Sequence, residues 1–202
     1  MKKTLDEHAA RFDDIAAAYD ENKSEEYNEC VRLVVEHATA GLTGDETVLD
    51  LATGTGAIAL AVAGSAGRVV GRDISEGMME EARAKAAERG VENVEFDEGR
   101  FRSPSYDGPV EVVASNFAMH HLADEEKREA IDVIAGLDPE KIVLGDVMLF
   151  GEPNPKEPFF SPDVDDPATV GVLADAFTDA GYALTAVEMV HDQVGVLVAE
   201  RV

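Results

Sequence analysis

The chain has 202 residues, 45% of them hydrophobic, which suits one domain with a sizeable core and excludes general disorder. Forty-two Asp and Glu against 17 Lys and Arg give a formal net charge of −25, which disfavours direct nucleic-acid binding because phosphates would meet carboxylates. No run of the ~18 apolar residues that a membrane-spanning helix needs is present, so we expect no membrane segment. The single cysteine, Cys30, excludes an internal disulfide framework.

The acidic residues are spread over many expected helix faces and loops rather than gathered in one tail. Such a surface is typical of a halophile's protein, because concentrated salt screens the repulsion between carboxylates. We therefore expect a halophilic protein that loses its fold at low ionic strength. The polar N-terminus, residues 1–7, lacks the apolar region of a secretion signal, so we expect a cytoplasmic location.

Two amphipathic helices are expected at the N-terminus. Apolar residues between positions 12 and 19 recur with helical spacing, and a second helix is expected after Ser24, with Glu25 and Glu26 in its first turn, where negative charge is favoured. We divide the chain into N-terminal helices at 1–44, which cover the site, and a core at 45–202, within a single domain overall.

Residues 48–56, VLDLATGTG, predict a buried strand that runs into a glycine turn, and residues 57–62 then begin an apolar helix. Glycines reach backbone angles closed to other residues, and the helix N-terminus offers free N–H groups to a ligand. Gly54 and Gly56 fit the G-x-G-x-x-[GA] pattern of dinucleotide-binding proteins. A nicotinamide-dependent oxidoreductase is therefore one candidate.

Read from Asp50, the same stretch resembles motif I of the class I S-adenosylmethionine-dependent methyltransferases, an acid-x-G-x-G-x-G pattern. The resemblance implies that Asp50 bonds the water or amino end of the cofactor. Gly54 and Gly56 would let the backbone pass the methionine moiety, with Thr53 between strand and turn. Ala52 replaces the first glycine of the pattern, and we expect ordinary backbone angles there because alanine carries a Cβ.

The segment 12–20 resembles the helix that precedes the core in ubiquinone/menaquinone-type methyltransferases, which are similar to methyltransferase types 11 and 12. In that family an aromatic residue at the position of Tyr19 helps to cover the cofactor. Simple packing of Tyr19 is the alternative interpretation.

Residues 68–73 predict a second strand that ends in an acid. A carboxylate at Asp73 can accept hydrogen bonds from both ribose hydroxyls, which the dinucleotide and methyltransferase interpretations both require. We expect Arg72 at the rim of the sheet rather than buried. The family resemblance implies that Ile74 and Met78 line the adenosine pocket, with ordinary core packing as the alternative.

After the third expected strand, the family has a Gly-Asp pair whose carboxylate accepts from the adenine amino group. Here the pair is Gly99-Arg100, and arginine has only donors. Either Asp97 or Glu98 substitutes for the acceptor, or adenine is recognised by backbone N–H groups and the Phe101 ring.

Residues 110–116 predict strand four, and the resemblance implies that Ser115 and Asn116 face the methyl-transfer centre. The proline pair of amide-nitrogen methyltransferases is absent, so that mechanism is not supported. His120 and His121 follow, and either offers a general base near neutral pH or a cap or pocket wall. We rank His120 first and keep Asn116 as a further catalytic candidate. Because adjacent residues do not share a metal as a helical i,i+4 pair does, we predict no metal site.

Residues 141–146 predict strand five, ending with Asp146 at the ligand rim, and residues 151–167 form a proline-rich, ordered loop. Phe159 and Phe160 either line an acceptor pocket or anchor this loop to the core. We expect the next helix to begin at 166–167, an Asp-Pro pair.

Residues 182–190 and 194–202 predict two strands joined so tightly that they must pair antiparallel. A closing hairpin after alternating strands and helices is expected of class I methyltransferases and not of a dinucleotide-binding domain. The predicted fold is therefore α/β, a doubly wound, Rossmann-like and mostly parallel sheet with a C-terminal antiparallel β-hairpin.

The resemblance implies methyl transfer from S-adenosyl-L-methionine to an acceptor that the residues do not identify. The acceptor is either a small molecule under the N-terminal helices or a macromolecule, in which case a small zinc-ribbon activator protein is an expected partner. A nicotinamide-dependent oxidoreductase and a non-catalytic S-adenosylmethionine-binding protein remain the alternatives.

Overall fold

The computed structural model describes residues 4–21, 23–152 and 159–202. Its centre is a seven-stranded sheet with the order β3-β2-β1-β4-β5-β7-β6. The strands are β1 (Thr47–Leu51), β2 (Arg68–Asp73), β3 (Val94–Glu98), β4 (Val112–Asn116), β5 (Lys141–Val147), β6 (Tyr182–His191) and β7 (Val194–Arg201). The helices are α1 (Leu5–Ile15), α2 (Glu25–Thr39), α3 (Ala57–Val62), α4 (Glu76–Arg89), α5 (Asp124–Ala135) and α6 (Val170–Asp179), with 3-10 turns η1 (Ala16–Ala18) and η2 (Met119–His121).

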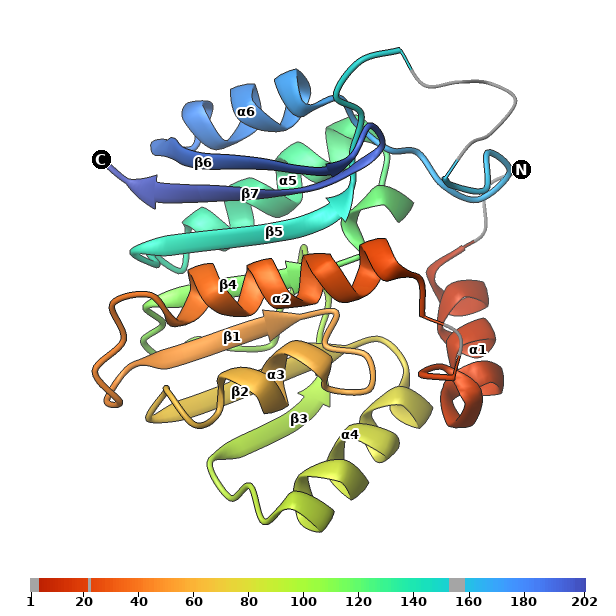
Figure 1. Ribbon diagram of the computed structural model, residues 1–202, viewed down its shortest axis with the longest axis vertical. Coiled ribbons are helices and arrows are strands. Elements are labelled where there is room, and N and C mark those ends of the chain that lie inside the picture. Colours follow the sequence, from red (N-terminus) through yellow and green to blue (C-terminus); the bar gives the residue numbers. More distant parts are fainter. Residues whose placement is uncertain (1–3, 22, 153–158) are drawn as a thin grey trace.

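The first five strands are parallel, whereas β7 pairs antiparallel with both β5 and β6. The predicted fold, a mostly parallel sheet that ends in an antiparallel hairpin, is thereby confirmed. The hairpin folds back so that β7, the later strand, lies inside the sheet and β6 forms its edge (Figure 1). Within the described residues, no helix combines the length and apolar character that crossing a membrane requires.

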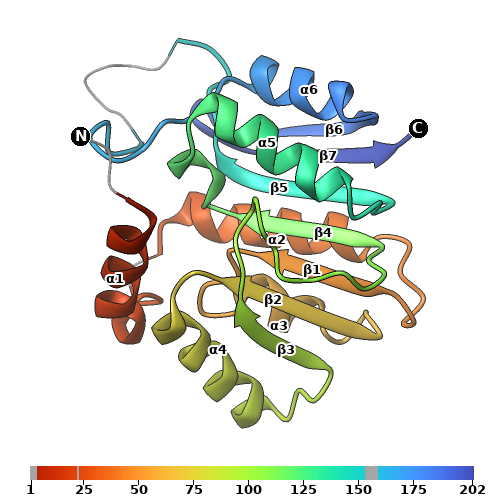
Figure 2. The same cartoon turned by 180° about the vertical axis from the view of Figure 1, so that it is seen from behind.

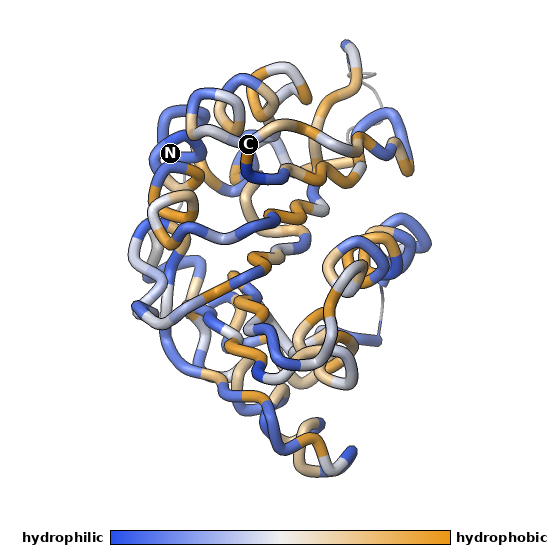
Figure 3. The backbone as a smooth tube through the Cα atoms, turned by 90° about the vertical axis from the view of Figure 1, so that its left-hand side faces the viewer, coloured by the Kyte–Doolittle hydropathy of each residue, from blue (hydrophilic) through white to orange (hydrophobic). Residues whose placement is uncertain are grey.

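Two hydrophobic layers enclose the sheet. Successive residues of a strand point to opposite faces, so Val48 joins one layer and Leu49 the other. Helices α2, α3 and α4 cover the first face, and α5 and α6 cover the second (Figures 1 and 2). Both faces of the inner strands are therefore shielded from water. Figure 3 shows hydrophobic residues concentrated along these strands.

Helix α1 lies beyond the carboxyl ends of the parallel strands (Figure 1). Thr4 caps its N-terminus through a capping box with Glu7. Asp13 fixes it to the start of α4, because its Oδ1 accepts hydrogen bonds from the Ser75 hydroxyl at 2.6 Å and from the Gly77 N–H at 2.9 Å. The N-terminal helix is therefore held at the edge of the sheet where ligands bind in such folds.

The predicted start of α6 is wrong. The helix begins at Val170, and its N-cap is Thr169, whose hydroxyl accepts from the Val172 N–H at 3.2 Å. Asp166 cannot act as the cap because its backbone is used elsewhere: its N–H donates to His120 O at 2.7 Å, and its carbonyl accepts from the Lys127 ammonium.

The expected rim position of Arg72 is also wrong, since Arg72 is only 5% exposed. Its guanidinium donates to Gly71 O and to a Glu95 carboxylate oxygen, each at 3.0 Å. The guanidinium carbon, Cζ, lies 5.9 Å from the centre of the Tyr106 ring. Burial is tolerated because a partner on the neighbouring strand β3 compensates the charge.

Gly145 on β5 has no room for a side chain. A Cβ there would overlap Asn116 Oδ1 and lie 2.7 Å from Val34 Cγ2 on α2. We expect Gly145→Ala to lower the free energy of unfolding by about 1–3 kcal/mol, because α2 or Asn116 must shift. Urea denaturation in concentrated salt measures this. The matched control is Gly64→Ala, whose Cβ meets nothing within 4 Å and should change stability by less than about 0.5 kcal/mol. Equal losses in both variants would contradict the packing argument.

Candidate active site

A cavity of about 650 Å³ opens at the carboxyl ends of β1, β2 and β4, under α1. Its volume lies within the range of small-molecule sites. Twelve of the residues predicted to bind the cofactor line it: Tyr19, Asp50, Ala52, Thr53, Gly54, Asp73, Ile74, Met78, Gly99, Arg100, Phe101 and Asn116. The structure thus brings together residues that are spread over nearly a hundred positions of the sequence.

Three predicted residues lie elsewhere. Gly56 is the N-cap of α3, with φ 83°, and lines a separate hollow with Asp20 and Lys85. Ser115 is buried, and its hydroxyl has no hydrogen-bond partner among the described residues. His120 is buried beside the cavity, whereas the neighbouring His121 lines it.

The turn after β1 corrects the expectation for Ala52. Ala52 has φ 57°, a left-handed conformation that costs an L-residue about 1–2 kcal/mol. The main chain imposes this angle because the Thr53 N–H donates to Arg72 O at 3.0 Å, which ties the turn to β2. Gly54 follows with φ 53°, and its N–H donates to Asp73 Oδ2 at 2.8 Å. The glycine usual at this place would adopt the conformation without strain.

Asp50 is completely enclosed at one side of the cavity. Burial raises its pKa to about 7, even though the Thr53 hydroxyl at 2.6 Å and the Ala59 N–H at 3.1 Å both donate to its Oδ2. Because a buried anion without a positive partner is costly, this carboxylate favours a ligand that brings hydrogen-bond donors or positive charge.

Asp73 ends β2 on the opposite side of the turn. Burial also raises the pKa of Asp73, while the backbone N–H groups of Ser75, at 2.9 Å, and of Gly54 act in the other direction. These two amides fix the orientation of the carboxylate. The two carboxylate oxygens together offer about four acceptor positions, so lone pairs remain for a ligand's hydroxyl groups.

The predicted adenine end contains Gly99, Arg100 and Phe101. Neither Asp97 nor Glu98 is among the described residues that line the cavity, so the proposed substitution by either carboxylate has no geometric support. A Cβ at Gly99 would lie 2.6 Å from Pro104 O, so the close passage of the chain requires glycine. The Phe101 ring and the local backbone remain for recognition of a base.

The N-terminal segment covers the cavity with aromatic side chains. Phe12 and Tyr19 both line it, with ring centroids 6.3 Å apart in an edge-on arrangement. Burial is the main cause that raises the pKa of Tyr19 to about 12, and the nearby charge of Asp73 is the second. The Tyr19 hydroxyl therefore stays neutral. His8, which we did not predict from the sequence, also lines the cavity and lies on α1, as Phe12 does. Its spacing of four residues from Phe12 was the available signal.

At the other end, Asn116, Phe117 and His121 line the cavity. The side-chain amide of Asn116 is buried, and its two polar atoms have no hydrogen-bond partner of normal geometry among the described residues. Phe117 adopts φ 54°, an uncommon angle for a bulky residue that often marks a functional site. This end therefore presents the polar side chain of Asn116, which lies beside Tyr27, to whatever occupies the cavity.

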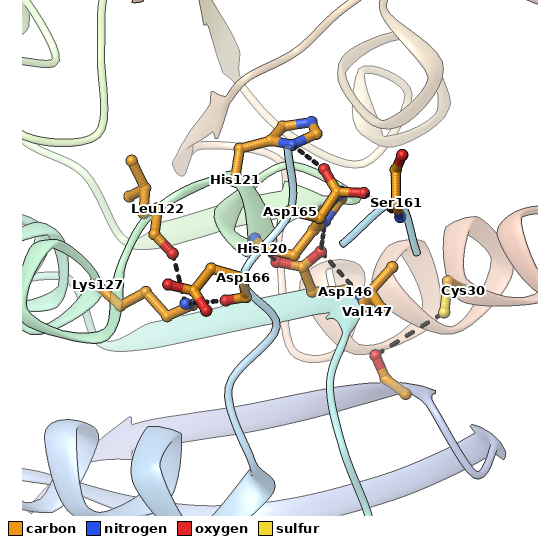
Figure 4. Close-up of polar contacts among 11 residues, drawn as sticks. Cys30, His120, His121, Leu122, Lys127, Asp146, Val147, Ser161, Asp165 and Asp166 are labelled. Carbon is orange, nitrogen blue, oxygen red and sulfur yellow. Dashed lines mark hydrogen bonds and ion pairs between the residues drawn. The ribbon is translucent and has the colours of Figure 1, made fainter. Parts of the chain in front are cut away.

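Both histidines of η2 are paired with carboxylates (Figure 4). His120 Nδ1 lies 2.5 Å from Asp146 Oδ1, and His121 Nδ1 lies 2.7 Å from Asp165 Oδ1. Burial alone would lower the pKa of His120, but Asp146 and Asp165 raise it. Burial lowers the pKa of His121, so the histidine that faces the cavity is the more readily neutral of the two.

Phe159 anchors its loop to the core. Its ring lies 6.2 Å from Phe117 and 5.6 Å from His191, and its N–H donates to Gln193 Oε1 at 2.9 Å. Neither Phe159 nor Phe160 is among the described residues that line the cavity. The first half of the proline-rich loop, with Pro153, Pro155 and Pro158, lies outside the described residues.

Comparison with known proteins places this geometry in a family. A family model described as a methyltransferase domain matches residues 48–137. The demethylmenaquinone methyltransferase of Clavibacter sepedonicus is 32% identical over 131 residues, which cover 63% of this chain and 52% of that protein. The arsenite methyltransferase of Halobacterium salinarum is 34% identical over 155 residues, 72% of this chain and 39% of that one. Residues 48–137 thus match a methyltransferase domain, and the fold is that of the class I S-adenosylmethionine-dependent methyltransferases.

The chain spans only part of the length of the curated relatives that it matches. An uncharacterised methyltransferase of Bacillus subtilis, YcgJ, is 36% identical over 90 residues, and the chain spans 36% of its length. Together with the values above, the chain spans about a third to a half of these relatives.

Solved structures show the same fold. Magnesium protoporphyrin IX methyltransferase from Synechocystis, solved with bound S-adenosylmethionine, is 21% identical, with a TM-score of 0.76 over 96% of this chain and 92% of that chain. The [4+2]-cyclase SpnF is 16% identical, with a TM-score of 0.79 over 99% and 97%. Because a cyclase shares the fold, the fold alone does not determine the reaction.

Proposed function

We propose that the protein transfers the methyl group of S-adenosylmethionine to a small-molecule acceptor. The strongest support comes from two buried carboxylates, Asp50 and Asp73, which lie on either side of one glycine turn in a cavity of ligand size. One carboxylate suits the ammonium end of the cofactor and the other suits its ribose. The cavity continues past them to Asn116 and His121, which leaves space for an acceptor.

In this proposal each side of the cavity holds one part of the cofactor. Asp73 accepts hydrogen bonds from the two ribose hydroxyls, and Asp50 binds the amino group directly or through water. Ile74 and Met78 flank the adenosine, and the Phe101 ring lies at the adenine end. The backbone at Gly54 passes the methionine moiety, where a side chain would obstruct it.

The reaction we propose is an in-line displacement. An acceptor lone pair forms a bond to the methyl carbon while the carbon–sulfur bond breaks, and its electron pair neutralises the sulfonium. The protein mainly aligns the two reactants, which is worth several kcal/mol. An acceptor hydroxyl must also lose its proton, and neutral His121, oriented by Asp165, is placed to accept it. This reverses the initial ranking of His120 over His121.

A small acceptor is favoured over a macromolecular one because the chain covers its own site. Thr4, His8 and Phe12 of the N-terminal segment line the cavity. A zinc-ribbon activator protein remains the alternative, and the exposed side chains of Val187 (48%) and Met189 (65%) on the edge strand β6 offer it an apolar surface. Poor solubility that co-expression with such a protein cures would favour that alternative.

Titration calorimetry with S-adenosylhomocysteine and with NADH tests the cofactor class. We expect the first to bind and the second not to. Enhanced NADH fluorescence without S-adenosylhomocysteine binding would instead indicate an oxidoreductase. Transfer of label from methyl-labelled S-adenosylmethionine to small molecules of a cell extract then tests turnover, and binding without transfer would indicate a non-catalytic binding protein.

The pKa of Asp50 predicts how cofactor binding depends on pH. If the ligand's ammonium group binds the ionised carboxylate, the protein must release a proton on binding below a pH of about 7. Affinity for S-adenosylhomocysteine should therefore rise roughly eightfold between pH 6 and 7.5, and it should fall again near pH 8 as the ligand's amino group is deprotonated. Calorimetry across this range measures the effect. Asp50→Asn should flatten the rising limb, and an unchanged profile would exclude this role for Asp50.

The proposed setting is the cytoplasm of a salt-adapted organism. The net charge of −25 supports it, as does the similarity to the Halobacterium salinarum enzyme.

A further inference from the structure

The ligand atoms of His120, His121 and Asp165 all lie within 4.8 Å of one another. We predicted no shared ion because adjacent residues do not share a metal as readily as a helical i,i+4 pair does. On the 3-10 turn η2, however, the two histidines converge: the two ring centroids are 4.1 Å apart. His121 Nδ1 lies 2.7 Å from Asp165 Oδ1, and His120 Nε2 lies 4.0 Å from the same oxygen.

His120 is oriented as metal-binding histidines are. The backbone N–H of His120 donates to Asp146 Oδ2 at 2.9 Å, and Asp146 Oδ1 lies 2.5 Å from Nδ1 of the His120 ring. A proton held on Nδ1 by this carboxylate leaves the lone pair on Nε2, the atom that faces Asp165. A carboxylate behind the histidine fixes both tautomer and ring orientation at metal sites.

Asp165 is held in place from its other side. Its Oδ2 accepts from the Ser161 N–H at 2.7 Å, which leaves Oδ1 directed at the histidines. The next residue, Asp166, donates its N–H to His120 O at 2.7 Å and so fastens this loop to η2. All three ligand groups therefore have fixed positions, although Asp165 lies more than 40 residues from the histidines in sequence (Figure 4).

We propose that His120, His121 and Asp165 bind a divalent transition-metal ion such as Zn²⁺. Two imidazoles and one carboxylate form a three-ligand set typical of zinc sites that keep an open position. Metal–ligand bonds of about 2.0–2.2 Å place tetrahedral ligand atoms roughly 3.3 Å apart, so adjustments of about 1 Å close the site. Nitrogen ligands favour Zn²⁺ over Mg²⁺, which prefers oxygen.

The position of His121 gives the ion a role in the proposed reaction. Because His121 lines the cavity and His120 lies behind it, an ion held by these residues would lie next to the acceptor end. An ion held there would bind an acceptor oxygen and lower the pKa of its hydroxyl, and His121 would then act as a ligand in place of its role as proton acceptor. This role rests on the proposed function, whereas metal binding itself does not.

The competing interpretation is an ion-pair network without metal, in which a protonated His120 bridges Asp146 and Asp165. The buried Lys127 is a further cation close to this cluster, and it is already bound by the carbonyls of Leu122 and Asp166 and by Asp124 at 3.2 Å. The carboxylates of the cluster thus remain available either to a protonated histidine or to an ion.

Calorimetric titration of chelator-treated protein with ZnCl₂ in molar KCl distinguishes the two. Excess Mg²⁺ in the buffer occupies the exposed carboxylates. We expect one Zn²⁺ to bind per chain. His120→Gln and Asp165→Asn each remove a ligand and should lower the affinity for Zn²⁺ at least about tenfold. Asp146→Asn removes only the group that orients His120 and should lower this affinity about tenfold. His37→Gln is the matched control, since His37 forms a similar pair with Glu188 at 2.7 Å far from the cluster, and it should bind as the wild type does.

Absorption of bound Co²⁺ supplies a second readout, because its visible bands are weak when six waters surround the ion and become much stronger when a four-coordinate protein site holds it. Circular dichroism verifies that each variant is folded. No stoichiometric binding, or equal affinity in the His120, Asp165 and His37 variants, would overturn the metal site and leave the ion-pair network. S-adenosylhomocysteine binding, measured separately, reports on the proposed function, so the two failures are distinguishable.

Discussion

Asp73→Asn should lower the affinity for S-adenosylhomocysteine about a hundredfold. The carboxylate is expected to accept two charge-assisted hydrogen bonds from the ribose, each worth about 1.5–3 kcal/mol. The amide retains one acceptor oxygen, so a loss of about 3 kcal/mol is expected, and each 1.4 kcal/mol is tenfold. Asparagine also keeps an acceptor for the N–H of Gly54 or Ser75, so the turn is better preserved than with alanine.

Calorimetry measures the affinity, and thermal melting without ligand verifies the fold. Asp132→Asn is the control, because Asp132 is an exposed aspartate on α5 that does not line the cavity and should leave the affinity unchanged. If Asp73→Asn binds within threefold of wild type while remaining folded, Asp73 does not hold the ribose and the cofactor orientation proposed here is wrong.

The second large effect is expected from salt. The chain carries 42 acids and a net charge of −25, and at low ionic strength the repulsion between them is unscreened over about 30 Å, against about 3 Å in molar salt. A repulsion comparable to a domain's whole stability, about 5 kcal/mol, corresponds to a melting temperature lower by about 10–20 °C. We therefore expect the cooperative melt in molar KCl to shift strongly downward or vanish in dilute buffer.

A neutral osmolyte at equal water activity is the control, because it leaves the charges unscreened. A variant with Glu25, Glu80, Glu88 and Asp132 changed to amides should depend less on salt, since these side chains are exposed. Identical melts in dilute buffer and molar KCl would show that the acidic surface does not control folding.

Much of the fold could be predicted from local sequence. The strand at 47–51, the turn and helix α3 follow from an apolar run, two glycines and a second apolar run, which local backbone preferences convert directly into structure. Strand β2 ends at Asp73 as predicted, and the short link at 192–193 forces the final two strands to pair antiparallel. The positions of most cavity residues follow, because parallel strands bring their carboxyl ends to one edge.

Other features depended on contacts that no local pattern records. Ala52 adopts a left-handed angle because β2 bonds the turn, and Arg72 is buried because Glu95 compensates its charge. His121 rather than His120 reaches the cavity because Asp146, from β5, binds the first histidine.

The sequence by itself determined the order in which strands and helices follow one another along the chain. It also determined which strands end in an acid, since both features depend on neighbouring residues. Only the tertiary structure decided which side chains share the cavity and that Asp165 meets the two histidines. Burial, charge compensation and the meeting of distant segments are properties of the packed molecule, because each depends on which surface another element covers.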